Sequence, residues 1–241
     1  MKAFVLQGRG IECEQEMKRA FEATQAFESV QYLNVNELFE DVSLLNDMQK
    51  NDWVGIPGGF SYSDHFGSGR LLSLDFQAAG LWEAFEDRKV NVLGICNGFQ
   101  ILTEANVFGE SVRLEHNLDQ GFIDRWVFTQ CADEVYKLPI RHGEGNLQYE
   151  SLVAEAKVVL KYSDKRFDNG SKERGAGLSV RKGESLWVGM MPHPEIALKR
   201  FDDPDRFGAD HFVQHRERLE NEEGDGLKLL KQIVQRQGEF E

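Results

Sequence analysis

The chain has few of the residues that would direct it to secretion, to membranes or to nucleic acids. Its 241 residues include three cysteines and five prolines, and 28 basic residues stand against 41 acidic ones, for a net charge of −13. No apolar run approaches the roughly 18 residues that a membrane-spanning helix requires. The acidic balance repels a polyanion, and no basic stripe offsets it. We therefore expect neither a membrane nor a nucleic acid as a partner.

The cysteines are also too few and too widely spaced for a disulfide framework. Cys13, Cys96 and Cys131 form no CxxC pair, and the histidines show no spacing typical of metal ligands. This pattern argues against disulfides and against a structural zinc site. The first residues, MKAFVLQGRG, contain too short an apolar segment for a secretory signal and lack the composition of a transit peptide. We expect a cytoplasmic protein without bridged cysteines.

Apolar runs alternate with amphipathic stretches over the first hundred residues, which is typical of βαβ units around a parallel sheet. Beyond residue 110 the strand-like runs look like antiparallel additions to that sheet. We predict an α/β fold, a mostly parallel open sheet with helices on both faces, in a single domain that spans residues 1–241. The expected strands are 2–8, 29–35, 52–59, 91–95, 111–117, 124–131, 157–162, 177–182 and 185–191, and the expected helices are 12–27, 69–89, 97–105 and 224–237.

One segment near the C-terminus differs from the rest of the chain in composition. Residues 199–223 are densely charged and have little apolar periodicity. Such a composition is typical of a solvated surface loop or helix, which is how we interpret it.

The stretch VLGICNGFQ, residues 92–100, places Cys96 between two glycines directly after an apolar run. If a strand precedes it and a helix follows, Cys96 lies on a sharp turn of the kind that exposes a nucleophile. The helix N-terminus favours the thiolate there, and the backbone N–H of Asn97 is placed to stabilise an oxyanion. The alternative is a buried cysteine that serves only as a small apolar side chain.

A thiol that performs acyl chemistry needs a base and a group that orients the base. The segment MMPHPE, residues 190–195, offers both. Its prolines bias the backbone towards extended conformations, so that Glu195 can reach a ring nitrogen of His193. His142 is the competing candidate base. Cys13 lies at an expected helix start and Cys131 near the end of a strand-like run, and we expect neither to lie beside a candidate base.

Further candidates lie in IPGGFSY, residues 56–62, and on the helix after Cys96. In the first segment Gly59 could turn a second backbone N–H towards an oxyanion, and Phe60 beside it is a candidate substrate contact. Gln100, one turn beyond Cys96, could hydrogen-bond an amide or an amino-acid head group. By itself, a PGG sequence usually marks a turn without a functional role, and a glutamine on a helix is usually solvated.

Together IPGGFSYSD, VLGICNGFQIL, HGEGN and VGMMPHPE resemble the class I glutamine amidotransferases, and more narrowly the glutaminase branch found in phosphoribosylformylglycinamidine synthases. The resemblance covers nearly the whole chain and implies a flavodoxin-like, three-layer fold. It implies that Cys96 is the nucleophile, that His193 is the general base and acid, and that Glu195 orients His193. It further implies that Gly59 and Asn97 donate to the oxyanion and that Gln100 contacts the substrate, L-glutamine.

The resemblance also implies a partner. The chain has no GxxxxGK[ST] loop and no other phosphate cradle or metal cluster, so we expect no cofactor in it. ATP and magnesium are expected on a synthetase subunit that receives the ammonia, with room for a small third subunit. Two alternatives stay open: a stand-alone cysteine γ-glutamyl hydrolase, and a non-catalytic binding module of the same fold.

Overall fold

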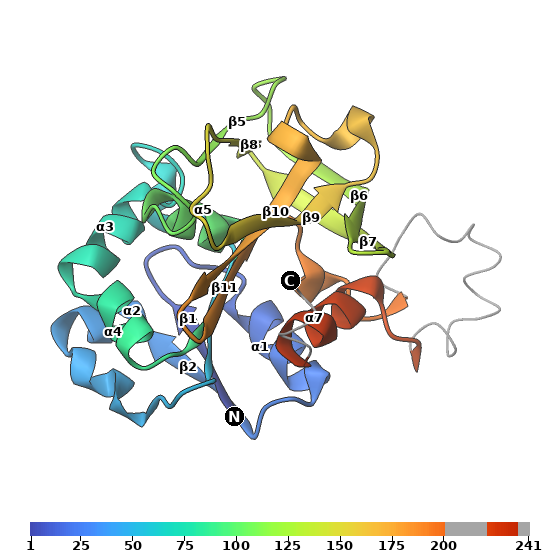
Figure 1. Cartoon of the computed structure of the whole chain (residues 1–241). Coiled ribbons are helices and arrows are strands. Elements are labelled where there is room, and N and C mark those ends of the chain that lie inside the picture. The colour runs from blue at the N-terminus through green and yellow to red at the C-terminus, as the bar shows by residue number, and fades with distance from the viewer. Residues whose placement is uncertain (201–220, 236–241) are drawn as a thin grey trace.

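The computed structural model describes residues 1–200 and 221–235, and a large mixed sheet runs through them (Figure 1). Nine strands form this sheet in the order β2-β1-β3-β4-β11-β10-β9-β6-β7, and β5 pairs with β8 in a second, two-stranded sheet. The bounds in sheet order are β2 Ser29–Asn34, β1 Lys2–Gln7, β3 Trp53–Ile56, β4 Asn91–Ile95, β11 Ser185–Met190, β10 Gly175–Lys182, β9 Ala156–Tyr162, β6 Ile123–Cys131 and β7 Glu134–His142, with β5 Arg113–His116 and β8 Glu144–Gln148.

The large sheet has two halves that differ in strand direction. Strands β2, β1, β3, β4 and β11 pair in parallel and form what we call the parallel half. From β11 outward, β10, β9, β6 and β7 pair antiparallel and form the antiparallel half. The predicted α/β class, with antiparallel strands added to a parallel sheet, is confirmed.

The prediction that residues 111–117 add a strand to the large sheet is wrong. The run at 111–117 does not join the large sheet; its strand pairs with β8, which contains residues 144–146 of the HGEGN motif. Its strand, β5, has no buried residue, so it offers no apolar face that a large sheet could cover.

Helices cover the sheet on both sides (Figure 1). α1 and α7 pack together on one side, and α3, α4 and α5 lie on the other. The expected helix 69–89 is in fact two helices, because Gly80 adopts a left-handed φ of 68° and its N–H donates to the Gln77 carbonyl, which ends the first of them. The bounds are α1 Glu14–Thr24, α2 Val35–Glu40, α3 Arg70–Ala78, α4 Leu81–Asp87, α5 Asn97–Glu104 and α7 Asp225–Gln235.

The covering helices explain why the central strands read as continuous apolar runs. Every residue of β3, β4 and β11 is buried, as expected for parallel strands that are packed on both faces. In residues 1–200 and 221–235, no helix is both long enough and apolar enough to cross a bilayer. Most of the charged segment 199–223 lies outside the described residues, so its interpretation as a solvated surface stays a prediction.

Candidate active site

Segments that carry predicted site residues meet at one edge of the parallel half. β3, β4 and β11 are neighbours, and Ile95 at the end of β4 pairs with Met190 at the end of β11. Because these strands run in the same direction, the loops after them emerge side by side at their carboxyl ends. The turn at Gly58, the thiol of Cys96 and the ring of His193 thereby come together from distant parts of the sequence.

Cys96 lies on the sharp turn between β4 and α5. Its backbone has φ 52° and ψ −104°, an unfavourable combination for a residue with a side chain. The turn is tight because α5 packs directly on β3: a Cβ at Gly98 would lie 1.9 Å from the carbonyl oxygen of Ile56. The Cys96 side chain is buried, and its thiol is 3.3 Å from the carbonyl oxygen of Arg141, to which it donates. A cysteine held in this way at a helix N-terminus has the geometry of a nucleophile elbow.

His193 and Glu195 form a buried pair after β11. The expected extended backbone is wrong here, because Pro194–Ile196 form a 3₁₀ helix, in whose first turn a proline is tolerated. Nδ1 of His193 is 2.6 Å from Oε1 of Glu195, and the two side chains are 4% and 0% exposed. Burial by itself lowers the pKa of His193, but the interactions with the Glu195 carboxylate and with the Cys96 sulfur outweigh it and raise the pKa. Among the described residues, Nε2 of His193 has no hydrogen-bond partner. The ring can therefore stay charged while one nitrogen is free for chemistry.

The space beside Gly58 shows how close His193 lies to Cys96. A Cβ at Gly58 would lie 2.9 Å from Cε1 of His193 and 3.6 Å from Cβ of Cys96. The side chains of both residues therefore flank the same glycine. Only a residue without a side chain leaves them this space.

Two backbone donors remain available beside the thiol. Within the described part of the chain, neither the N–H of Gly59 nor that of Asn97 donates a hydrogen bond. Asn97 is the first residue of α5, where N–H groups have no partner inside the helix. Gly59 has φ 150°, and a Cβ there would lie 2.4 Å from the carbonyl oxygen of Gly10, so the position requires glycine.

Side chains of α5 tie the two neighbouring loops together. Oδ1 of Asn97 accepts from the backbone N–H of Ser61 at 3.2 Å, and its Nδ2 donates to Gln100 at 2.9 Å. Nε2 of Gln100 donates in turn to the backbone oxygen of Glu144 at 2.7 Å. Both ends of the Gln100 amide are thus engaged within the chain. Phe60 is 44% exposed, and its ring centroid is 6.2 Å from that of Phe122. That Gln100 and Phe60 contact a substrate stays a prediction.

His142, the competing base, has a different environment. It is buried, and its Nδ1 is 2.9 Å from the amide oxygen of Asn117. That oxygen can only accept, so Nδ1 carries the proton. Burial, followed by the nearby charges of His193 and Arg125, lowers the pKa of His142 to about 4. His142 is therefore neutral and oriented by an amide, whereas His193 faces a carboxylate.

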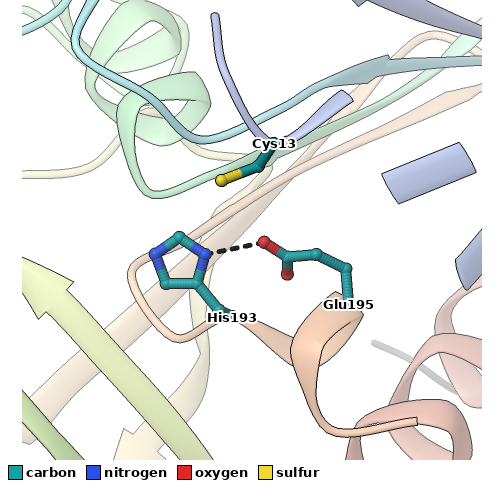
Figure 2. A group of neighbouring side chains, drawn as sticks. All are labelled: Cys13, His193 and Glu195. Carbon is teal, nitrogen blue, oxygen red and sulfur yellow. Dashed lines mark hydrogen bonds and ion pairs between the residues drawn. The ribbon is translucent and has the colours of Figure 1, made fainter. Parts of the chain in front are cut away.

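The prediction that Cys13 lies away from any candidate base is wrong. Its Sγ, a ring nitrogen of His193 and a carboxylate oxygen of Glu195 all lie within 4.8 Å of one another (Figure 2). The backbone N–H of Cys13 donates to the carbonyl oxygen of Gly58 at 3.1 Å, which fixes this approach. The sequence held one weak signal: Cys13 follows β1, which is the parallel neighbour of β3. Cys131 lies elsewhere in the core, and all three cysteines are free.

Comparison with known proteins gives a consistent result. Residues 1–219 match the family of CobB/CobQ-like glutamine amidotransferase domains. Phosphoribosylformylglycinamidine synthase subunit PurQ from Pyrococcus horikoshii is 34% identical over 203 residues, which cover 76% of this chain and 80% of that protein. The subunit of the same name from Dehalococcoides mccartyi is 30% identical over 97% of this chain and 96% of its own length.

Solved structures agree with these relatives. A chain in the structure of PurLQS from Thermotoga maritima superposes with a TM-score of 0.69 at 25% identity, with 98% of each chain covered. This chain therefore belongs to the CobB/CobQ-like glutamine amidotransferases and, within them, to the PurQ subunits of phosphoribosylformylglycinamidine synthase.

Proposed function

We propose that this chain hydrolyses L-glutamine to glutamate and ammonia, and that it passes the ammonia to a synthetase subunit. The main support is the thiol of Cys96, which lies on a nucleophile elbow beside the buried pair of His193 and Glu195. A nucleophile, a base and a group that orients the base are what acyl transfer from an amide requires.

In the first step Cys96 gives its thiol proton to Nε2 of His193, and the resulting thiolate attacks the side-chain amide carbon of glutamine. A carbon–sulfur bond forms, and the amide oxygen takes the electron pair of its double bond. The N–H groups of Gly59 and Asn97, which have no other acceptor among the described residues, would stabilise this oxyanion. His193 then gives the proton on Nε2 to the amide nitrogen, the carbon–nitrogen bond breaks, and ammonia leaves.

In the second step water hydrolyses the glutamyl thioester. His193, now neutral, takes a proton from the attacking water through Nε2, and the same backbone donors hold the second oxyanion. The bond to sulfur breaks, which releases glutamate, and the thiolate takes its proton back from His193. Glu195 is bound to Nδ1 throughout, so it fixes the ring orientation and stabilises the imidazolium.

The acceptor half of the reaction belongs to a partner. The chain has no GxxxxGK[ST] loop that could hold ATP. We place ATP and magnesium on a synthetase subunit, which converts formylglycinamide ribonucleotide to the amidine in cytoplasmic purine biosynthesis. The relatives are named as synthase subunits, and PurLQS is the name of the similar assembly, which is consistent with a separate synthetase and a small third subunit.

The test is Cys96→Ala in the complex with the synthetase subunit. We expect glutamine-dependent amidine formation to disappear while formation from added ammonia stays close to that of the unchanged complex, because the thiol acts only in releasing ammonia. Equal loss of both activities in a complex that still assembles would contradict this role.

Two further measurements separate the alternatives. A stand-alone hydrolase would release glutamate rapidly from a γ-glutamyl substrate as an isolated chain. A non-catalytic module would leave Cys96 unlabelled by a glutamine-like electrophile.

A further inference from the structure

Cys13, His193 and Glu195 offer three different ligand atoms to one point in space (Figure 2). Their sulfur, nitrogen and oxygen atoms lie within 4.8 Å of one another. Thiolate, imidazole and carboxylate are the donors that Zn²⁺ takes, with bonds of roughly 2.0–2.3 Å, so ligand atoms around one zinc ion are roughly 3–4 Å apart. Side-chain movements of about 1 Å would bring these three atoms to that spacing.

Two polar atoms of this group have no hydrogen-bond partner among the described residues and could coordinate an ion. They are Oε2 of Glu195 and Nε2 of His193, and both are buried. The Glu195 carboxylate can therefore turn towards an ion without breaking a second bond. Gly58 keeps the centre of the group open, since a Cβ there would lie 3.4 Å from Sγ of Cys13 and 2.9 Å from Cε1 of His193.

The nucleophile is not part of this group. Sγ of Cys96 donates instead to the carbonyl oxygen of Arg141 at 3.3 Å. Cys13 is half-buried, whereas His193 and Glu195 are closed off from solvent, so an ion entering the group meets Cys13 first. We propose that Cys13, His193 and Glu195 form an inhibitory zinc site that takes the catalytic base out of use.

Binding follows ordinary metal–ligand chemistry. Zn²⁺ bonds to the sulfur of Cys13, a ring nitrogen of His193 and an oxygen of Glu195, and a water molecule can complete a tetrahedron. The thiol proton of Cys13 and one ring proton of His193 pass to solvent. With a ring nitrogen bonded to the ion and the imidazolium proton lost, His193 can no longer act as the acid that protonates the departing amide nitrogen. The loss of activity rests on the proposed function, but the binding of the ion does not.

The experiment uses Co²⁺ as a spectroscopic probe on the full-length chain after treatment with a chelator. Co²⁺ bound by a thiolate gives a near-ultraviolet charge-transfer absorption, which Zn²⁺ abolishes when it displaces the ion. We expect this absorption in the unchanged chain, in Cys131→Ala as the matched cysteine control, and in Cys96→Ala. We expect it to be absent from Cys13→Ala and Cys13→Ser, with zinc affinity lowered at least about a hundredfold, since even changes beyond the ligands cost up to that much.

Three results would overturn the site: no absorption in the unchanged chain, absorption that persists without Cys13, or absorption that is lost with Cys96. The first needs no variant, so it decides the matter even if a variant fails to fold. In the assembled synthase, zinc should inhibit glutamine-dependent activity, and Cys13→Ala should need at least about a hundredfold more zinc. Absorption without inhibition would uphold the site and count instead against the role of His193 in the proposed function.

Discussion

The two halves of the large sheet contribute to the candidate site in different ways. The parallel half supplies side chains: Cys96 follows β4, and His193 and Glu195 follow β11. The antiparallel half and the neighbouring β8 supply carbonyl oxygens. Those of Pro139, Arg141 and Glu144 accept from the N–H of His193, the thiol of Cys96 and the amide of Gln100.

The burial of the strands explains this division. Parallel strands are covered by helices on both faces, so polar chemistry can only emerge at their carboxyl ends, where loops begin. Strand β6 alternates buried and exposed residues only from Val127 to Cys131, and Leu138, Pro139 and Ile140 of β7 are all buried. Where β7 reaches the site, it contributes the backbone carbonyl oxygens of Pro139 and Arg141. The reacting groups thus come from one half, and the rigid acceptors that position them come from the other.

The largest effect is expected from Glu195→Gln in the parallel half. The amide keeps the size of the side chain but removes the charge that opposes burial at His193, so the pKa of His193 should fall. We expect kcat with glutamine to drop by on the order of 10²–10⁴, by analogy with a triad that loses its orienting carboxylate. The alkaline limb of the pH profile should move to lower pH, because the imidazolium that protonates the amide nitrogen is lost at lower pH. An unshifted limb would contradict the pairing.

The same pair gives a stability signature. The pKa of His193 is raised from 6.5 to about 10 in the folded chain. The imidazolium therefore adds stability that is fully present below pH 6.5 and is lost as the pH rises through about 10. The difference in Tm between the unchanged chain and Glu195→Gln should be largest near pH 6 and shrink towards pH 10. A difference that grows with pH would show that the pair is not charged.

A somewhat smaller effect is expected from Gly59→Ala. The new Cβ would lie 2.4 Å from the carbonyl oxygen of Gly10, so the turn must move and its N–H must leave the oxyanion. Loss of one such donor costs on the order of 10²–10³ in kcat. Gly67→Ala is the matched control, because Gly67 also has a positive φ, of 109°, but has no atom within 4 Å of the new Cβ. Similar losses of kcat in both variants would point to general backbone strain instead of a displaced donor.

Most of the parallel half could be predicted from the sequence, because each of its features is local. A buried strand reads as an apolar run, and the glycines around Cys96 mark a tight turn before the helix begins. The pairing of His193 with Glu195 also follows from their separation by one residue, although Pro194–Ile196 form a 3₁₀ helix and not the extended segment that the prolines predict. Adjacent strands then bring these local features to one edge of the sheet.

What could not be predicted depends on contacts between distant segments. Cys13 approaches His193 because β1 and β3 are neighbours and because the Gly58 carbonyl holds its backbone, and neither fact is visible in residue spacing. The carbonyl oxygens of the antiparallel half carry no side-chain signature at all. The break at Gly80 is not visible in the apolar pattern, because that pattern continues on both sides of it.

The smallest effect is expected from His142→Gln, which asks whether the antiparallel half also supplies a reacting side chain. His142 is held neutral by Asn117, with its pKa lowered to about 4, so it carries no charge over the pH range in which the proposed chemistry runs. We expect kcat to stay within about tenfold of the unchanged enzyme, below the 10²–10⁴ typical of a lost general base. The limbs of the pH profile should not move. The free energy of unfolding should fall by about 1–3 kcal/mol, because the amide of Asn117 loses a buried partner.

His193→Gln is the matched variant, and it should lose several orders of magnitude in kcat. If the two substitutions instead reduced kcat equally in chains of equal stability, the antiparallel half would also supply a reacting side chain, and the division between side chains from one half and carbonyl oxygens from the other would fail.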